Sequence, residues 1–312
     1  MLDRFLKQTT FTSLEDFNKN FSMIIPEDFN FAYDVMDEWA RTAPDRLAMI
    51  WTNDRGEERR FTFADLKRES DKAAGYLASL GIKKHDMVLL ILKRRYQFWI
   101  AMLALHKIGA VAIPASFLLT KKDIVYRVKC ADIKTIICCG DAEILQHVND
   151  AYDEWPALAH RISIGPVVPK GWDDFNAGTS AATPYTRPLR HNKATDPLLM
   201  YFTSGTSGQP KMVLHDQTYA IGHIGTAAYW HNLRPDSLHL TVSDSGWGKC
   251  AWGKLYGQWI VGVTLFVYDH EKFTPADILH KIEQYRITSF CAPPTIYRFM
   301  IREDLSKYDL SA

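Results

Sequence analysis

The sequence predicts an α/β fold in which mostly parallel sheets are flanked by helices. From residue 47 onward, short apolar runs of strand length alternate with segments whose apolar residues recur at helical spacing. That alternation is typical of a parallel sheet covered by helices on both faces. In addition, 47% of the 312 residues are hydrophobic and 23% are charged. The chain therefore has enough apolar surface for a substantial core and is not of the disordered class.

The first expected elements are a short helix and a hairpin. Residues 33–41 are predicted to form a helix that ends before Pro44, in an N-terminal extension that covers the first subdomain. Apolar runs at 47–51 and 60–63 flank the turn-like segment 53–56. This pattern predicts two antiparallel strands.

The next elements alternate as the fold class requires. Thr62 and Asp65 have the spacing of a capping pair and predict a helix start, and Gly81 marks the end of that helix. The segment 96–108 is apolar nearly all round, as expected of a helix buried on a sheet, and it stops at Gly109. The other elements expected in this part are strands at 87–92, 111–114 and 133–138 and a helix at 121–129.

A proline- and glycine-rich stretch at 165–197 predicts a connection between two subdomains. We therefore expect a first α/β subdomain with its N-terminal extension at 1–190 and a second α/β subdomain at 191–312.

The second subdomain resumes the alternation of strands and helices. Apolar runs at 261–268 and 287–291 predict strands. A helix between them, 275–286, is well specified, because Thr274 can cap it and Pro275 suits its first position.

The most informative stretch is a glycine-rich loop between the apolar runs 198–202 and 212–214. It combines hydroxyl groups, glycines whose backbone N–H groups can approach a ligand, and one terminal cation, which suits an anion with several oxygens such as a polyphosphate. The spacing fits neither a Walker A loop nor the G-x-G-x-x-G of dinucleotide folds. On composition alone, a solvated turn without chemistry remains the alternative. The candidate binding residues are Thr203, Ser204, Gly205, Thr206, Ser207, Gly208 and Lys211.

Composition excludes several classes of partner. Lys and Arg number 37 against 36 Asp and Glu, and a net charge of +1 provides no electrostatic footprint for nucleic acid or an anionic membrane. The five cysteines show no C-x-x-C spacing, so neither a disulfide framework nor a cysteine zinc site is expected. The most hydrophobic region, 87–104, is broken by a basic run at 93–95 and falls short of the roughly 20 apolar residues of a membrane span. The start of the sequence lacks a secretory signal, and we expect a cytoplasmic protein.

Several motifs together resemble one family. The segment 201–211 is similar to the phosphate-loop signature of the adenylate-forming superfamily. The segment 242–247 resembles the aromatic motif of medium-chain acyl-CoA synthetases, and 291–298 and 108–114 resemble further segments of that group. The resemblance, which extends to the acetyl-CoA synthetase group, covers the chain from about residue 30 onward.

The resemblance implies a reaction and its reactants. A short- or medium-chain carboxylic acid would be activated with ATP to acyl-AMP, and the acyl group would then form a thioester with coenzyme A, with Mg²⁺ as a further cofactor. The loop residues would hold the β- and γ-phosphates. Trp247 would line or gate the acyl pocket, with Gly246 and Gly248 giving room around it, and a core aromatic is the alternative for Trp247.

Other polar residues near these motifs receive structural roles. His215 and His223 are assigned to packing or surface hydrogen bonding, because a carboxylate is already ionised at neutral pH and needs no base. Cys250 is expected to be a small apolar residue of the core or pocket. The basic run 93–95 is interpreted as a solvated strand end rather than a contact for the phosphates of coenzyme A.

The resemblance also implies that the family continues beyond the last motif found here. Family members add a magnesium-binding glutamate, a ribose-binding aspartate and a mobile C-terminal domain with a lysine for adenylation. We therefore expect the N-terminal portion of an acyl-CoA synthetase, without a certain catalytic residue or metal ligand and inactive alone. A truncated product, a split gene and a degenerate copy all fit, and the alternative is a non-catalytic protein that binds nucleotide or phosphate.

Overall fold

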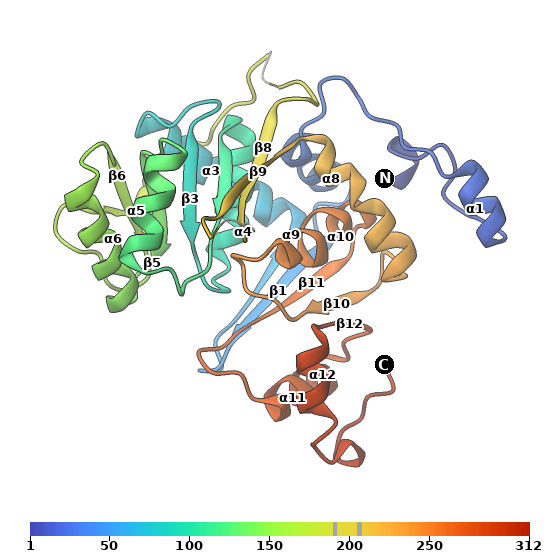
Figure 1. The fold of residues 1–312 in the computed structure, drawn as a ribbon. Helices are drawn as coiled ribbons and strands as arrows, with labels where there is room; N and C mark the ends of the chain where they lie inside the picture. The colour runs from blue at the N-terminus through green and yellow to red at the C-terminus, as the bar shows by residue number, and fades with distance from the viewer. Residues whose placement is uncertain (190–191, 205–207) are drawn as a thin grey trace.

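The structure is a computed structural model that describes residues 1–189, 192–204 and 208–312. Two sheets and their covering helices form the molecule, and α1 (Leu14–Asn20) lies at its periphery (Figure 1), where the centre of the Phe17 ring is 5.2 Å from that of Tyr229. The expected α/β class is confirmed. Among the described residues, every helix is too short or too polar to cross a lipid bilayer.

The larger sheet has seven strands in the order β7-β6-β5-β3-β4-β8-β9. Neighbouring strands are parallel except for the antiparallel pair β8 and β9 at one edge. The strands are β3 (Met87–Ile91), β4 (Val111–Pro114), β5 (Thr135–Cys139), β6 (His160–Ile164), β7 (Asp173–Asp174), β8 (Pro197–Thr203) and β9 (Lys211–Asp216).

The smaller sheet has five strands in the order β12-β10-β11-β1-β2. The expected hairpin forms its antiparallel edge, and the other pairs are parallel. The strands are β1 (Leu47–Asn53), β2 (Glu58–Thr62), β10 (Leu238–Thr241), β11 (Thr264–Asp269) and β12 (Ser289–Cys291).

The two sheets do not follow the expected division of the chain at residue 190. β1 and β2 precede that position but pair with β11, which follows it, and β8 and β9 follow it but extend the sheet of β3 to β7. Each sheet therefore needs strands from both sides of the proline-rich stretch. Secondary structure also continues through part of that stretch, as β7 and α7 (Phe175–Ala181).

Helices cover both faces of the larger sheet. α3 (Phe63–Ser79) packs against α4 (Gln97–Ile108) on one side, and α5 (Lys121–Cys130) packs against α6 (Ala142–Glu154) on the other (Figure 1). The Thr62–Asp65 capping box at the start of α3 is confirmed, with Asp65 N donating to Thr62 Oγ1 at 3.1 Å and Thr62 N donating to Asp65 Oδ2 at 3.0 Å.

α4 is buried along its whole length, as its composition predicts. It lies between the larger sheet and the helices that precede β11, and the Trp99 indole donates to the Lys254 carbonyl at 2.9 Å. The helix ends at Gly109, whose φ of 83° lies in the left-handed region that favours glycine.

The other helices are short. The N-terminal part contributes η1 (Leu2–Arg4), η2 (Ala32–Asp37) and α2 (Glu38–Thr42), and the last two confirm the helix expected at 33–41. The second half contributes α8 (Thr218–Gly222), η3 (Gly225–Trp230), α9 (Gly248–Lys254), α10 (Tyr256–Val261), α11 (Pro275–Tyr285), α12 (Pro294–Met300) and η4 (Leu305–Lys307).

Elements without a clean apolar pattern were not predicted. β6 begins with His160 and Arg161, and β10 contains the fully buried His239, so neither forms a continuous apolar run. The predicted strand at 261–268 starts late, because Val261 ends α10 and Gly262 caps that helix with a φ of 86°.

Candidate functional site

The glycine-rich loop joins two paired strands, as predicted. β8 and β9 are antiparallel, and Thr203 lies opposite Lys211. Gly205, Thr206 and Ser207 lie outside the described residues. Thr203 Oγ1 contacts the Lys211 carbonyl only at the 3.5 Å limit of a hydrogen bond, and both side chains are exposed. The described ends of the loop thus present a hydroxyl and an ammonium group to solvent.

Gly208 has the backbone conformation for which glycine is needed. Its φ is +87°, and an added Cβ would meet nothing within 4 Å. The glycine is therefore required by the turn itself rather than by a crowded neighbour. Just after it, the Tyr126 hydroxyl on α5 donates to the Pro210 carbonyl at 2.8 Å and anchors the end of the loop.

A cavity of about 570 Å³ brings the loop together with the aromatic motif. Thr203 at the end of β8 and Ser204 after it line one side, and Gly246, Trp247 and Gly248 line it where α9 begins. The remaining lining residues are Pro114, Ala115, Ser116, Leu119, Arg127, Tyr201, Phe202, Val213, His215 and Tyr219. Two motifs that are far apart in the sequence therefore share one mainly apolar space.

Trp247 is a wall of this cavity and not a core residue. Its exposed fraction is 66%, which contradicts the alternative that it packs in the interior. It precedes α9, whose first residue is Gly248. The indole can therefore meet a ligand without disturbing the core.

Gly246 lets the aromatic segment approach β4 closely. An added Cβ would lie 2.2 Å from the Ala115 carbonyl carbon and 2.3 Å from Ser116 N, both of which are backbone atoms. The missing side chain of Gly246 thus lets two backbone segments come close together. At Gly248 an added Cβ would only touch the Tyr201 ring at 4.0 Å. Gly246 is needed for the shape of the cavity wall.

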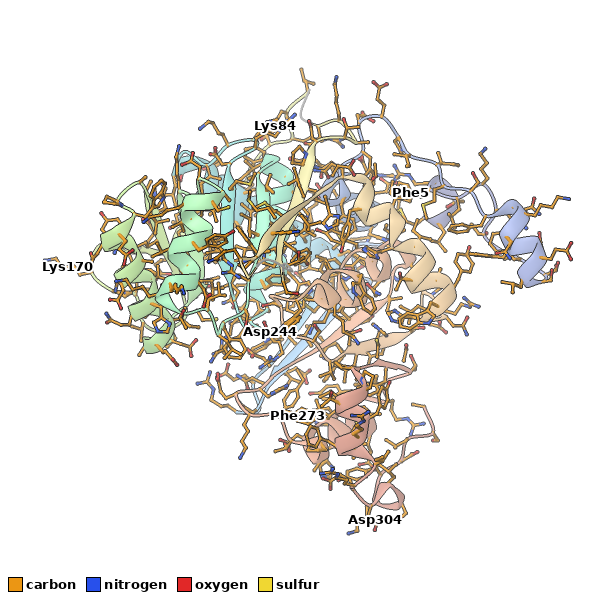
Figure 2. The ribbon with its side chains drawn as sticks, viewed as in Figure 1. Phe5, Lys84, Lys170, Asp244, Phe273 and Asp304 are labelled. Carbon is orange, nitrogen blue, oxygen red and sulfur yellow. The ribbon has the colours of Figure 1, made fainter. Side chains whose placement is uncertain are left out.

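The aromatic segment is held by contacts to the end of β3. Asp244 Oδ1 accepts from Gly246 N at 3.0 Å, and Asp244 Oδ2 accepts from Arg94 Nη1 at 3.3 Å. Ser245 donates to the Leu92 carbonyl. Asp244 lies where the two sheets meet (Figure 2), so these bonds connect the cavity wall to both.

The basic run at 93–95 was wrongly interpreted as a solvated strand end. The side chains of Lys93 and Arg94 are each 11% exposed. Lys93 Nζ pairs with Glu271 at 2.6 Å, and Arg95 Nη1 pairs with Asp269 at 2.8 Å. The partners follow β11, so the run ties the carboxyl end of one sheet to that of the other. Sequence reasoning missed this because the partners are distant in the chain.

The histidines after the loop pack against aromatic rings, as expected. The ring centroids of His215 and Tyr219 are 4.2 Å apart, and those of Tyr219 and His223 are 4.4 Å apart. Burial lowers the pKa of His215, and burial, followed by the neighbouring His215, lowers the pKa of His223 to about 4. Both rings are therefore weaker bases than an ordinary histidine.

Cys250 is a core residue, as predicted. It is fully buried, and burial raises the pKa of its thiol to about 12. A thiol with this pKa stays protonated at neutral pH and is not an activated nucleophile.

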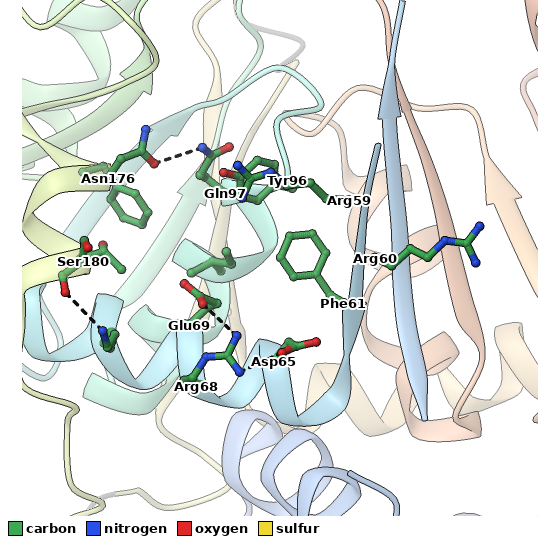
Figure 3. Close-up of a pocket in the computed structure, with 14 residues that line it drawn as sticks. Arg59, Arg60, Phe61, Asp65, Arg68, Glu69, Tyr96, Gln97, Asn176 and Ser180 are labelled. Atoms are coloured by element: carbon green, nitrogen blue, oxygen red, sulfur yellow. Dashed lines mark hydrogen bonds and ion pairs between the residues drawn. The ribbon is translucent and has the colours of Figure 1, made fainter. Parts of the chain in front are cut away.

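A second groove, of about 700 Å³, lies between β2, α3, α4 and α7 (Figure 3). Its charges already have partners: Arg68 pairs with Asp65 at 2.8 Å and with Glu69 at 3.2 Å, and Lys72 donates to the Ser180 carbonyl at 3.2 Å. None of the described site candidates lines it. The cavity beside the loop is thus the better candidate site.

The magnesium ion implied by the resemblance finds no ready ligand set in the part of the chain that the structure describes. No group of three His, Cys, Asp or Glu side chains is placed there to hold a metal. We assign no step of the chemistry to a metal bound by these residues.

Comparison with known proteins decides the family. Residues 36–312 match the family described as AMP-binding enzyme. The chain belongs to the AMP-binding enzyme family. The predicted resemblance to adenylate-forming enzymes is therefore confirmed.

The curated relatives of this chain are named acyl-coenzyme A synthetases. Mitochondrial ACSM5 of Rattus norvegicus is 34% identical over 291 residues, which cover 91% of this chain and 50% of that protein. Mitochondrial ACSM3 of Homo sapiens is 33% identical over 306 residues, which cover 96% of this chain and 52% of that protein. The chain spans about half the length of the curated relatives it matches.

Solved structures share the fold of this chain. An acyl-CoA synthetase of Brucella canis superimposes with a TM-score of 0.77 at 24% identity, covering 88% of this chain and 49% of that one. The anthranilate CoA ligase AuaEII, in complex with anthranoyl-AMP, superimposes with a TM-score of 0.81 at 22% identity, covering 92% of this chain and 54% of that one.

The expectation of a cytoplasmic protein is contradicted by the curated relatives, whose names place them in mitochondria. The expectation was wrong because it rested on the lack of a secretory signal and of a membrane span, which says nothing of addresses to other organelles. Organelle addresses are short segments read by receptors and are independent of the fold.

Proposed function

We propose that this chain is the part of an acyl-CoA synthetase that binds the polyphosphate of ATP and a short- or medium-chain carboxylic acid. The whole protein would form acyl-AMP and then transfer the acyl group to coenzyme A. One observation carries the proposal: Thr203 and Ser204 of the loop line the same cavity as Trp247. A phosphate-binding segment and an apolar wall side by side are what a reaction between a nucleotide and an aliphatic acid needs.

The proposed chemistry requires positioning and neutralisation of charge. A carboxylate oxygen attacks the α-phosphorus of ATP, a new P–O bond forms, and the bond to the β-phosphate breaks to release pyrophosphate with its electron pair. No proton has to be removed from the nucleophile, because a carboxylate is ionised at neutral pH.

Named residues have separate tasks in this proposal. The hydroxyls of Thr203 and Ser204, the backbone N–H of Gly208 and the ammonium of Lys211 would bind the β- and γ-phosphates and stabilise the charge that develops on the leaving group. Trp247, with Gly246 and Gly248 beside it, would bound the space for the acid and limit its length.

The loop assignment is tested by measuring the binding of ATP and of inorganic pyrophosphate to the chain by titration calorimetry. Lys211→Ala removes a charge-assisted contact and should weaken both ligands about tenfold or more. The control is Lys170→Ala, because Lys170 is exposed and lies at the far end of the molecule from the cavity (Figure 2). Equal affinities in the wild-type chain and in Lys211→Ala would remove Lys211 from the site.

A further inference from the structure

Arg127 on α5 is a buried cation beside the loop, and no motif in the sequence singles it out. Its side chain is 11% exposed, and its guanidinium lies 5.0 Å from the centre of the Phe202 ring. Arg127 also lines the cavity that Thr203 and Ser204 line.

Arg127 is the charged residue of the cavity. No other Lys, Arg, Asp or Glu among the described residues lines that space, and Arg127 shares it with Thr203 and Ser204. Lys211 is exposed on β9 and is not among the lining residues. An anion that reaches the loop hydroxyls inside the cavity therefore shares that space with a guanidinium.

The internal partners of Arg127 leave much of its hydrogen-bonding capacity unused. Its Nη1 donates to the Asp123 carbonyl at 2.9 Å, and the Asp123 carboxylate is 4.0 Å away, at the edge of an ion pair. That carboxylate already accepts from Thr120 N at 3.0 Å and from Thr120 Oγ1 at 2.7 Å. A guanidinium has five N–H donors, so most of them can serve a ligand.

The electrostatic environment of Arg127 also favours a bound anion. Burial lowers the pKa of Arg127, and the nearby Asp123 offsets this only in part. A buried charge with weak pairing destabilises the protein unless an opposite charge approaches. A bound anion would supply that charge.

We propose that Arg127 binds phosphate oxygens of the polyphosphate that occupies this cavity, as a second cation in addition to Lys211. The inference deepens the proposed function and rests on it. The planar guanidinium matches two oxygens of a phosphate group at once, which an ammonium cannot do. Arg127 is then a binding residue contributed by α5, and Tyr126 beside it holds the end of the loop at Pro210.

The test measures binding of inorganic pyrophosphate, ATP and octanoate to the full chain by titration calorimetry. Arg127→Gln should weaken pyrophosphate and ATP about tenfold or more and leave octanoate unchanged. Arg127→Lys keeps the charge but loses the planar fork, and it should bind pyrophosphate with an affinity between wild type and Arg127→Gln. Arg298→Gln is the matched control, because Arg298 is exposed on α12, on the other side of the molecule (Figure 1).

Thermal unfolding of each variant without and with pyrophosphate separates binding from folding. The wild-type midpoint should rise with pyrophosphate, and the rise should be lost in Arg127→Gln. If Arg127→Gln does not fold, the comparison of Arg127→Lys with wild type decides: a pyrophosphate affinity equal to wild type overturns the inference.

The remaining outcomes are distinct. If wild type and Arg127→Gln bind pyrophosphate equally, the Arg127 assignment is wrong and the proposed function stands. If Arg127→Gln weakens octanoate alone, the guanidinium recognises the acid and the inference is overturned. If wild type binds neither pyrophosphate nor ATP, the proposed nucleotide binding by this chain and the role of Arg127 both fail.

Discussion

At the scale of single residues, the cavity wall depends on Gly246, whose lack of a side chain lets a second backbone segment come close. Gly246 has no φ that demands glycine, but its Cα faces the backbone of Ala115 and Ser116 at the end of β4. A side chain of any size would push the aromatic segment away from β4. The position of Trp247 is therefore set by the residue before it.

Adding one methyl group at Gly246 should destabilise the protein. Gly246→Ala should lower the free energy of unfolding by about 1–3 kcal/mol, since the added carbon meets backbone atoms that cannot move aside. Urea denaturation measures the change. Gly225→Ala is the control, because a Cβ there meets nothing within 4 Å. An equal decrease in the free energy of unfolding in both variants would show that the close approach to the end of β4 is not the cause of the destabilisation.

At the scale of elements, the carboxyl ends of the two sheets are joined by charged side chains. The turn after β3 contributes Lys93, Arg94 and Arg95, and the residues after β10 and β11 supply their acidic partners. Arg94 and Asp244 are both 11% exposed, so their attraction is little screened by water. The pair connects β3 to the segment that carries Trp247.

Breaking this pair should cost more than breaking a surface pair. Arg94→Ala leaves the Asp244 carboxylate buried without its cation, and the free energy of unfolding should fall by about 3 kcal/mol. Arg41→Ala removes the partner of Glu38. Because the Arg41 side chain is 70% exposed, this change should lower the free energy of unfolding much less than Arg94→Ala does. Urea denaturation of both variants checks the order, and an Arg94→Ala loss no larger than that of Arg41→Ala would contradict it.

At the scale of the whole molecule, burial keeps a set of histidines neutral. It lowers the pKa of two of them to about 3 and of three others to about 4, from an ordinary value of 6.5. Below pH 6.5 the unfolded chain therefore binds more protons than the folded chain does. The residues are His106, His239, His223, His231 and His270.

The consequence is a loss of stability in mild acid. The stabilisation that comes from keeping these histidines neutral is fully present above pH 6.5 and declines as the pH falls toward 4. The free energy of unfolding should therefore drop by at least about 2 kcal/mol between pH 7 and pH 5. Denaturant titrations at several pH values measure it. His106→Gln should flatten the dependence, and His280→Gln, at an exposed position, should not. A stability that is constant from pH 7 to pH 5 would refute this account.

The sequence by itself determined the α/β class, most of the elements and the family. These depend on local patterns: the capping pair Thr62 and Asp65, the apolar composition of α4 on nearly all sides, and the loop motif at 203–211. Interactions within a few residues set such patterns, so they can be read without knowing the fold.

Only the tertiary structure decided how the strands are shared between the sheets and which residues meet. β1 joins β11, Arg94 meets Asp244, and Arg127 lines a cavity with Ser204, in each case across a long stretch of chain. Such contacts arise because a parallel sheet and the helices that cover it bring distant segments of the chain side by side. A local sequence pattern does not reveal such a long-range contact, because the two residues interact only after the chain has folded.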